Sequence, residues 1–108
     1  MARFDVYRSL ARSAASAPFL IDVQNNMLSS LRTRIVIPLR TVPALSRRGV
    51  IDVPPDLFPS LHIEGSDYYL TTTELGAIEY ARLGPFVICA VAYQNAIQAS
   101  LDRVFGSH

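Results

Sequence analysis

Most of the chain consists of short segments of two kinds. In one kind apolar and polar residues alternate, and in the other β-branched and apolar residues dominate. Such segments predict β-strands, and they span residues 3–8, 19–23, 34–39, 61–63, 68–72, 79–83 and 86–91. Pro38 predicts that the third strand lies at a sheet edge or at a bulge. Short glycine-containing stretches separate the fourth strand from the fifth and the sixth from the seventh, which predicts two hairpins.

The C-terminal segment has a different period. Apolar residues recur there at spacings of three and four, at Tyr93, Ile97, Leu101, Val104 and Phe105. This spacing predicts an amphipathic helix over about 93–105, ended by Gly106. Strands joined by short connections and followed by one helix, without alternation of strand and helix, favour an antiparallel barrel or curled sheet that the helix caps.

The remaining segments predict connections. Residues 9–17 are expected to form a flexible hairpin loop, 24–26 a turn and 27–31 a short irregular or helical segment. Residues 40–59 contain four prolines and predict a long connection with at most a short strand at 50–53. A single helical turn is expected near 74–77.

Composition limits the classes of protein. The chain has 108 residues, half of them hydrophobic, with a net charge of +1 and one cysteine. This is enough for one core, so a single domain over 1–108 is predicted and disorder is not. One cysteine excludes an internal disulfide and a cysteine-based zinc site, and the small net charge gives no basic field for nucleic acid. No apolar run is long enough to span a membrane, so a cytoplasmic protein is expected.

One alternative concerns the N-terminal region. Residues 6–21 are rich in Arg, Ser and Ala and contain no acidic residue, which is typical of a transit peptide. Asp5 and the strand-like alternation of residues 3–7 argue against that interpretation.

Residues able to support catalysis are few. His62 lies between two apolar residues and is expected to be a structural histidine, and Cys89 lies in an apolar strand and is expected to be buried and inert. No nucleophile elbow, phosphate-binding loop or metal-ligand cluster is present in the sequence. Arg47 and Arg48, with Arg40 nearby, form a basic patch on a loop. These features favour an interaction protein without cofactor or metal, not an enzyme.

Several blocks resemble the CcdB toxins of bacterial toxin–antitoxin pairs, in the same order and over nearly the whole chain. These blocks are residues 1–7, 21–25, 34–39, 57–59, 61–63 and 72–74. The resemblance implies the SH3-like barrel of CcdB- and MazF-type toxins with a C-terminal helix, assembled as a homodimer. It implies a non-enzymatic plasmid-maintenance toxin that binds DNA gyrase A and traps the gyrase–DNA cleavage complex. It also implies a CcdA-type antitoxin, whose disordered segment wraps the toxin.

The resemblance also assigns residues. The gyrase-binding face would consist of the segment after the second block and of the helix with its tail, namely Asn25, Met27, Leu28, Asp102, Phe105, Gly106, Ser107 and His108. An acidic and apolar antitoxin segment would lie over arginine-bearing loops, for which the candidates are Arg8, Arg12, Arg47 and Arg48.

The tail departs from the family pattern. CcdB toxins carry Trp-Gly near their end, whereas this chain has no tryptophan, and Phe105-Gly106 takes their place only if the register slips by one. Two alternatives therefore stay open. One is a CcdB-fold homologue that binds an antitoxin but has another target or no gyrase activity. The other is a MazF-like endoribonuclease, which would need Arg34 or Arg82 beside a threonine and a carboxylate.

Overall fold

The computed structural model describes residues 2–47, 49 and 54–106, so the short strand expected at 50–53 lies outside the described residues. The strands are β1 (Asp5–Ser9), β2 (Phe19–Asp22), β3 (Thr33–Arg40), β4 (Ser60–Ile63), β5 (Ser66–Leu70), β6 (Gly76–Glu79) and β7 (Leu83–Cys89). The helices are α1 (Val42–Arg47) and α2 (Gln94–Phe105), with 3₁₀ turns η1 (Arg12–Ala15), η2 (Asn26–Leu28), η3 (Thr72–Glu74), η4 (Tyr80–Arg82) and η5 (Val91–Tyr93).

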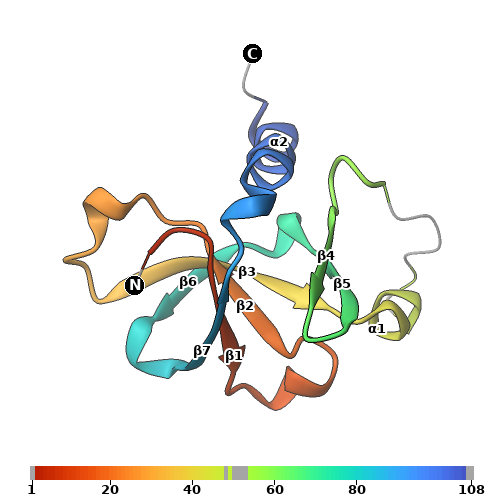
Figure 1. Ribbon diagram of the computed structural model, residues 1–108, viewed down its shortest axis with the longest axis horizontal. Coiled ribbons are helices and arrows are strands. Elements are labelled where there is room, and N and C mark those ends of the chain that lie inside the picture. The colour runs from red at the N-terminus through yellow and green to blue at the C-terminus, as the bar shows by residue number, and fades with distance from the viewer. Residues whose placement is uncertain (1, 48, 50–53, 107–108) are drawn as a thin grey trace.

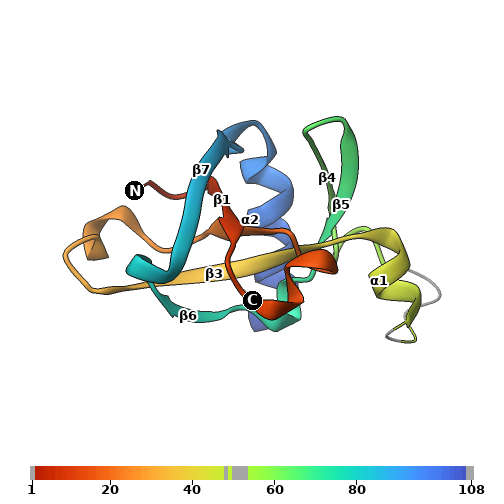
Figure 2. The same ribbon diagram turned by 90° about the horizontal axis from the view of Figure 1, so that it is seen from below.

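The described strands form one antiparallel sheet of seven, in the order β4-β5-β3-β2-β1-β7 with β6 added beside β3. The sheet curls into a half-barrel, and α2 stands against it (Figures 1 and 2). This confirms the predicted class, mainly β with a C-terminal helix. None of the helices in the described part of the chain is long and apolar enough to cross a membrane.

The strand that contains Pro38 is central and pairs with β2 without a register shift, so the prediction of a sheet edge or a bulge is wrong. β3 pairs with β2 on one side, and on the other side with β6 over 33–36 and with β5 over 39–40. The carbonyl of Pro38 accepts a hydrogen bond from the N–H of Thr71 at 3.2 Å. Because the N and C=O of one strand residue face the same side, the proline nitrogen faces the gap between β6 and β5. The missing N–H therefore costs no ladder hydrogen bond.

The first predicted hairpin is confirmed. β4 and β5 pair down to Ile63 opposite Ser66, which leaves a two-residue loop. Glu64 and Gly65 have φ values of 51° and 85°. Positive φ at both loop positions defines a type I′ turn, whose twist matches that of the flanking strands.

The second predicted hairpin is wrong, because β6 pairs with β3 and β7 pairs with β1. Gly84 lies inside β7 at a register shift in the β1–β7 ladder, and a Cβ there would lie 2.5 Å from the Arg8 carbonyl oxygen. Gly84-Pro85 therefore marks a close approach of two strands and not a turn. The helical turn expected near 74–77 lies earlier, at η3, and α1 forms within the connection expected over 40–59.

The core has two parts on opposite faces of the sheet. The larger part includes Ile97 and Leu101 of α2, packed against apolar residues of β1 to β5. The smaller part consists of Tyr7, Val36 and Leu83, with Leu20 and Ile78 beside them. The C-terminal helix is confirmed, and Gly106 ends it in the left-handed conformation (φ 65°) with its N–H bonded to the Asp102 carbonyl at 2.7 Å.

Candidate functional site

The η2 segment presents two apolar side chains to solvent. The side chain of Asn25 accepts a hydrogen bond from the Met27 N–H at 2.9 Å and so caps the turn. Met27 is 88% exposed and Leu28 is 48% exposed. The cap orders the backbone of the turn, from which both side chains face solvent.

The exposed side of α2 carries the other predicted residues that the structure describes. Phe105 belongs to the predicted apolar stripe, but it is 67% exposed while Ile97 and Leu101 are buried. Asp102 is partly buried and accepts a hydrogen bond from Gln98 at 3.2 Å. Ser107 and His108 lie outside the described residues.

Arg3 connects these two regions. Its backbone N–H donates to Asn26 Oδ1 at 2.8 Å, and its Nη2 donates to Gln98 Oε1 at 2.8 Å. A chain of hydrogen bonds thus runs from η2 through Arg3 and Gln98 to Asp102. The end of α2 that carries Phe105 lies away from the η2 loop (Figure 1). The sequence pattern alone gives no signal for Arg3, because its role depends on residues distant in the chain.

The four arginines proposed for antitoxin binding belong to different segments. Arg8 forms an ion pair with Glu64 at 2.7 Å, and Arg12 is exposed on η1. Arg47 is the last residue of α1, and nothing further is described of its side chain, while Arg48 lies outside the described residues. Arg8 near the end of β1 and Arg12 in the connection that follows are therefore close in sequence, and no hydrogen bond joins these two described residues.

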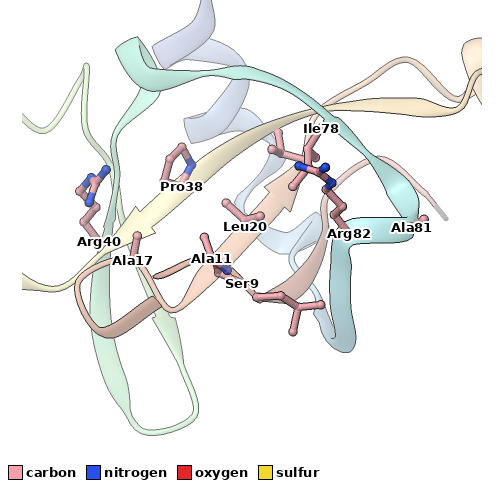
Figure 3. Close-up of a pocket in the computed structure, with 11 residues that line it drawn as sticks. Ser9, Ala11, Ala17, Leu20, Pro38, Arg40, Ile78, Ala81 and Arg82 are labelled. Carbon is pink, nitrogen blue, oxygen red and sulfur yellow. The ribbon is translucent and has the colours of Figure 1, made fainter. Parts of the chain in front are cut away.

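A pocket of about 520 Å³ adjoins that connection (Figure 3). Its lining is mostly apolar and includes Leu20, Pro38 and Ile78, with Arg40 and Arg82 at opposite ends. Arg40 forms an ion pair with Glu74 at 2.7 Å, while Arg82 makes no hydrogen bond or ion pair with the described residues. The sequence could not indicate this pocket, because it depends on the pairing of β6 with β3.

A buried polar cluster joins β2 and β3. Arg34 Nε donates to Asp22 Oδ2 at 2.7 Å, with side-chain exposures of 2% and 0%. The other carboxylate oxygen accepts the Gln24 N–H at 2.9 Å. Nη1 and Nη2 of Arg34 are buried and have no hydrogen-bond partner. The sequence does not predict this buried ion pair, since guanidinium groups are rarely fully buried.

The burial of Tyr7 makes the stability of the protein sensitive to alkaline pH. Burial, followed by the carboxylates of Asp5 and Asp22, raises the pKa of Tyr7 from 10.0 to about 12. The folded state thus favours the protonated phenol, and this contribution is complete below pH 10 and is lost as the pH rises through 12. The expected loss is about 3 kcal/mol. Urea unfolding between pH 9 and 12 measures it, and Tyr7→Phe should remove this part of the pH dependence. An unchanged pH dependence in Tyr7→Phe would contradict the prediction.

Two other candidates lie on the surface. Cys89 is exposed, so its predicted burial is wrong: β7 is an edge strand, and Leu83 is its one buried residue. His62 is exposed, with Nδ1 2.7 Å from Asp67 Oδ1. Among the described residues, no group of three or more His, Cys, Asp or Glu side chains is placed to hold a metal ion.

Two comparisons identify relatives of the chain. The fold is similar to that of an endoribonuclease in complex with its cognate antitoxin from a mycobacterial species. The TM-score is 0.75 over 98% of this chain and 95% of that chain, with 17% sequence identity, so this likeness concerns the fold alone. The family model described as CcdB protein matches residues 3–106. The chain belongs to the CcdB family.

Proposed function

We propose that this chain is the toxin of a bacterial toxin–antitoxin pair and acts as a homodimer that binds DNA gyrase A and traps the cleavage complex. Its action is binding and not catalysis, and a CcdA-type antitoxin neutralises it. The family match over residues 3–106 supports this function. The fold shared with a toxin-type protein solved with its cognate antitoxin supports the antitoxin partnership.

The observation that carries the gyrase proposal is the exposure of Met27 and Leu28 on a capped turn. Large apolar side chains grouped on a surface are typical of protein-binding sites. The hydrogen bonds of Arg3 to Asn26 and Gln98 hold this turn in a fixed position relative to α2. Because the backbone of the turn is already ordered, binding costs less backbone entropy there than it would on an unstructured loop.

The mechanism requires selectivity for one state of the target. A ligand shifts an equilibrium only by its difference in affinity between two states. The toxin therefore has to bind the open, DNA-cleaving form of gyrase more tightly than the closed form. No side chain of the toxin has to take part in a chemical step.

The pocket between β6 and the β1–β2 connection is the proposed antitoxin site. Its apolar lining suits apolar side chains, and Arg82 is available for an acidic one. Arg12 lies on the adjoining connection and Arg8 at the end of β1 that leads into it, although Arg8 would have to give up Glu64 to bind a new partner. Leu10 lines the same pocket and is largely exposed.

Variants of the two surfaces test these assignments separately. Met27→Asp combined with Leu28→Asp places two charges in the proposed gyrase interface and should weaken binding to a gyrase A fragment by about 3 kcal/mol. The matched control Leu10→Asp should weaken antitoxin binding and leave gyrase binding unchanged. Calorimetry and the amount of gyrase-cleaved DNA measure the two effects. Absence of any cleavage complex with wild-type protein at micromolar concentration would contradict the gyrase target, and retained antitoxin binding would then favour a homologue with another target.

The fold shared with an endoribonuclease makes RNA cleavage the second candidate. Two observations weigh against it. Arg34 is buried and paired with Asp22, and Arg82 lies in a pocket whose lining includes no threonine or acidic residue. Degradation of purified RNA that is abolished by Arg82→Gln would favour this candidate over gyrase.

A further inference from the structure

Arg34 has two hydrogen-bonding nitrogens that the described residues leave unused. Nε is bonded to Asp22, but Nη1 and Nη2 are buried without a partner. Buried donors in folded proteins are nearly always paired, because an unpaired buried donor has lost its bonds to water without replacement. Two adjacent unpaired donors on one guanidinium therefore indicate a group that the isolated chain does not supply.

Arg34 also lines an open pocket. This pocket has a volume of about 350 Å³, and its other lining residues are Ser29, Ser30, Leu31 and Tyr80. Leu31 and Tyr80 of this lining are each about half exposed. A ligand reaches the buried guanidinium only if side chains of the lining change rotamer. The serines add hydroxyl donors at the pocket wall.

We propose that this pocket binds a carboxylate from an acidic side chain of a partner polypeptide. A carboxylate is planar and presents two oxygens, which match the paired donors of a guanidinium edge. Because Asp22 already neutralises Arg34, the additional positive charge comes from Arg32, which is exposed and whose carbonyl oxygen is bonded to the N–H of Tyr80. Glu79 is exposed nearby and opposes this charge.

The surroundings favour a polypeptide over a nucleic-acid phosphate. Leu31, Tyr80 and the neighbouring Leu28 are exposed and apolar, which suits the side chains on either side of an acidic residue. A nucleic acid would bring many phosphates, and the chain has a net charge of only +1 to meet them. Ser29, Ser30 and Leu31 of this pocket directly follow η2, which the proposed function assigns to the binding of gyrase A. The identity of the partner as gyrase A therefore rests on the proposed function, whereas the carboxylate site itself is tested without gyrase.

The test is a titration of the isotope-labelled protein with the peptide acetyl-Leu-Glu-Leu-amide, followed by NMR. The matched ligand is acetyl-Leu-Gln-Leu-amide, and inorganic phosphate is the third probe. The expected result is a shift of the Ser29, Ser30 and Tyr80 amides with the glutamate peptide, at an affinity about tenfold higher than with the glutamine peptide. Equal affinity for the two peptides, a response to phosphate alone, or no response to any probe would each overturn the proposal.

Variants locate the site. Asp22→Asn combined with Arg34→Gln removes both buried charges together and should abolish the preference for the glutamate peptide. Ser30→Leu fills the pocket from an exposed position, so it tests the site even if the double variant fails to fold. Arg103→Gln, which changes an exposed arginine on α2 outside both pockets, is the control and should leave the preference unchanged. Retention of the preference in Ser30→Leu, or its loss in Arg103→Gln, would place the binding site elsewhere and overturn the assignment.

Discussion

Asp22→Ala is expected to lower the free energy of unfolding by about 3–5 kcal/mol. The side chain of Asp22 is fully buried and holds the buried guanidinium of Arg34 at 2.7 Å. Its removal leaves a positive charge in the interior without a counter-charge. It also removes the acceptor of the Gln24 N–H at the end of β2.

Urea unfolding measures this effect, and a second ion pair provides the control. Asp67→Ala makes the same truncation at the exposed pair with His62 and should cost less than about 1 kcal/mol. Asp22→Asn combined with Arg34→Gln should cost less than Asp22→Ala, because no uncompensated charge remains. Equal losses of unfolding free energy for Asp22→Ala and Asp67→Ala would show that the buried ion pair matters no more for stability than the exposed one.

Ile97→Ala should cost about 2–5 kcal/mol. Ile97 is completely buried and belongs to the main core cluster, to which α2 contributes only Ile97 and Leu101. A cavity there weakens the packing of α2 on the sheet, and the predicted gyrase-binding residues Asp102, Phe105 and Gly106 lie on or directly after this helix. Thermal and urea unfolding measure the loss.

The control for Ile97→Ala is Val91→Ala, a truncation at a half-exposed position just before α2. A change at such a surface site should stay within about 0.5 kcal/mol. If the two variants lost similar stability, the burial of Ile97 would not account for the packing of α2 on the sheet.

Elements that depend on neighbouring residues could be predicted from the sequence. The β4–β5 hairpin follows from two strand patterns around Glu64-Gly65, and α2 follows from the spacing of its apolar residues and from Gly106. The segments around Gly84 could not be assigned in this way. A glycine next to a proline indicates a turn locally, but here Gly84 is needed because the backbone of Arg8 approaches it.

The same distinction between local and distant contacts applies to the candidate site. The resemblance to the CcdB family predicts Met27 and Leu28 as binding residues, and the structure shows that both are exposed to solvent. It does not identify Arg3 or the burial of Arg34, because both depend on contacts between residues distant in sequence. The exposure of Cys89 could not be predicted for a related reason: an apolar strand is buried only where other elements cover it, and β7 lies at the edge of the sheet.

The pairing of β1 with β7 has a consequence for the time course of folding. β1 pairs on its second side with β7, which consists of residues 83–89. β3 pairs with three strands, β2, β5 and β6, so all three have to be present before its hydrogen bonds are complete. Sheets closed by such distant contacts have high contact order and fold slowly, in milliseconds to seconds. During synthesis β1 therefore remains without β7 until most of the chain has been made. The sheet of the nascent chain is incomplete for most of translation.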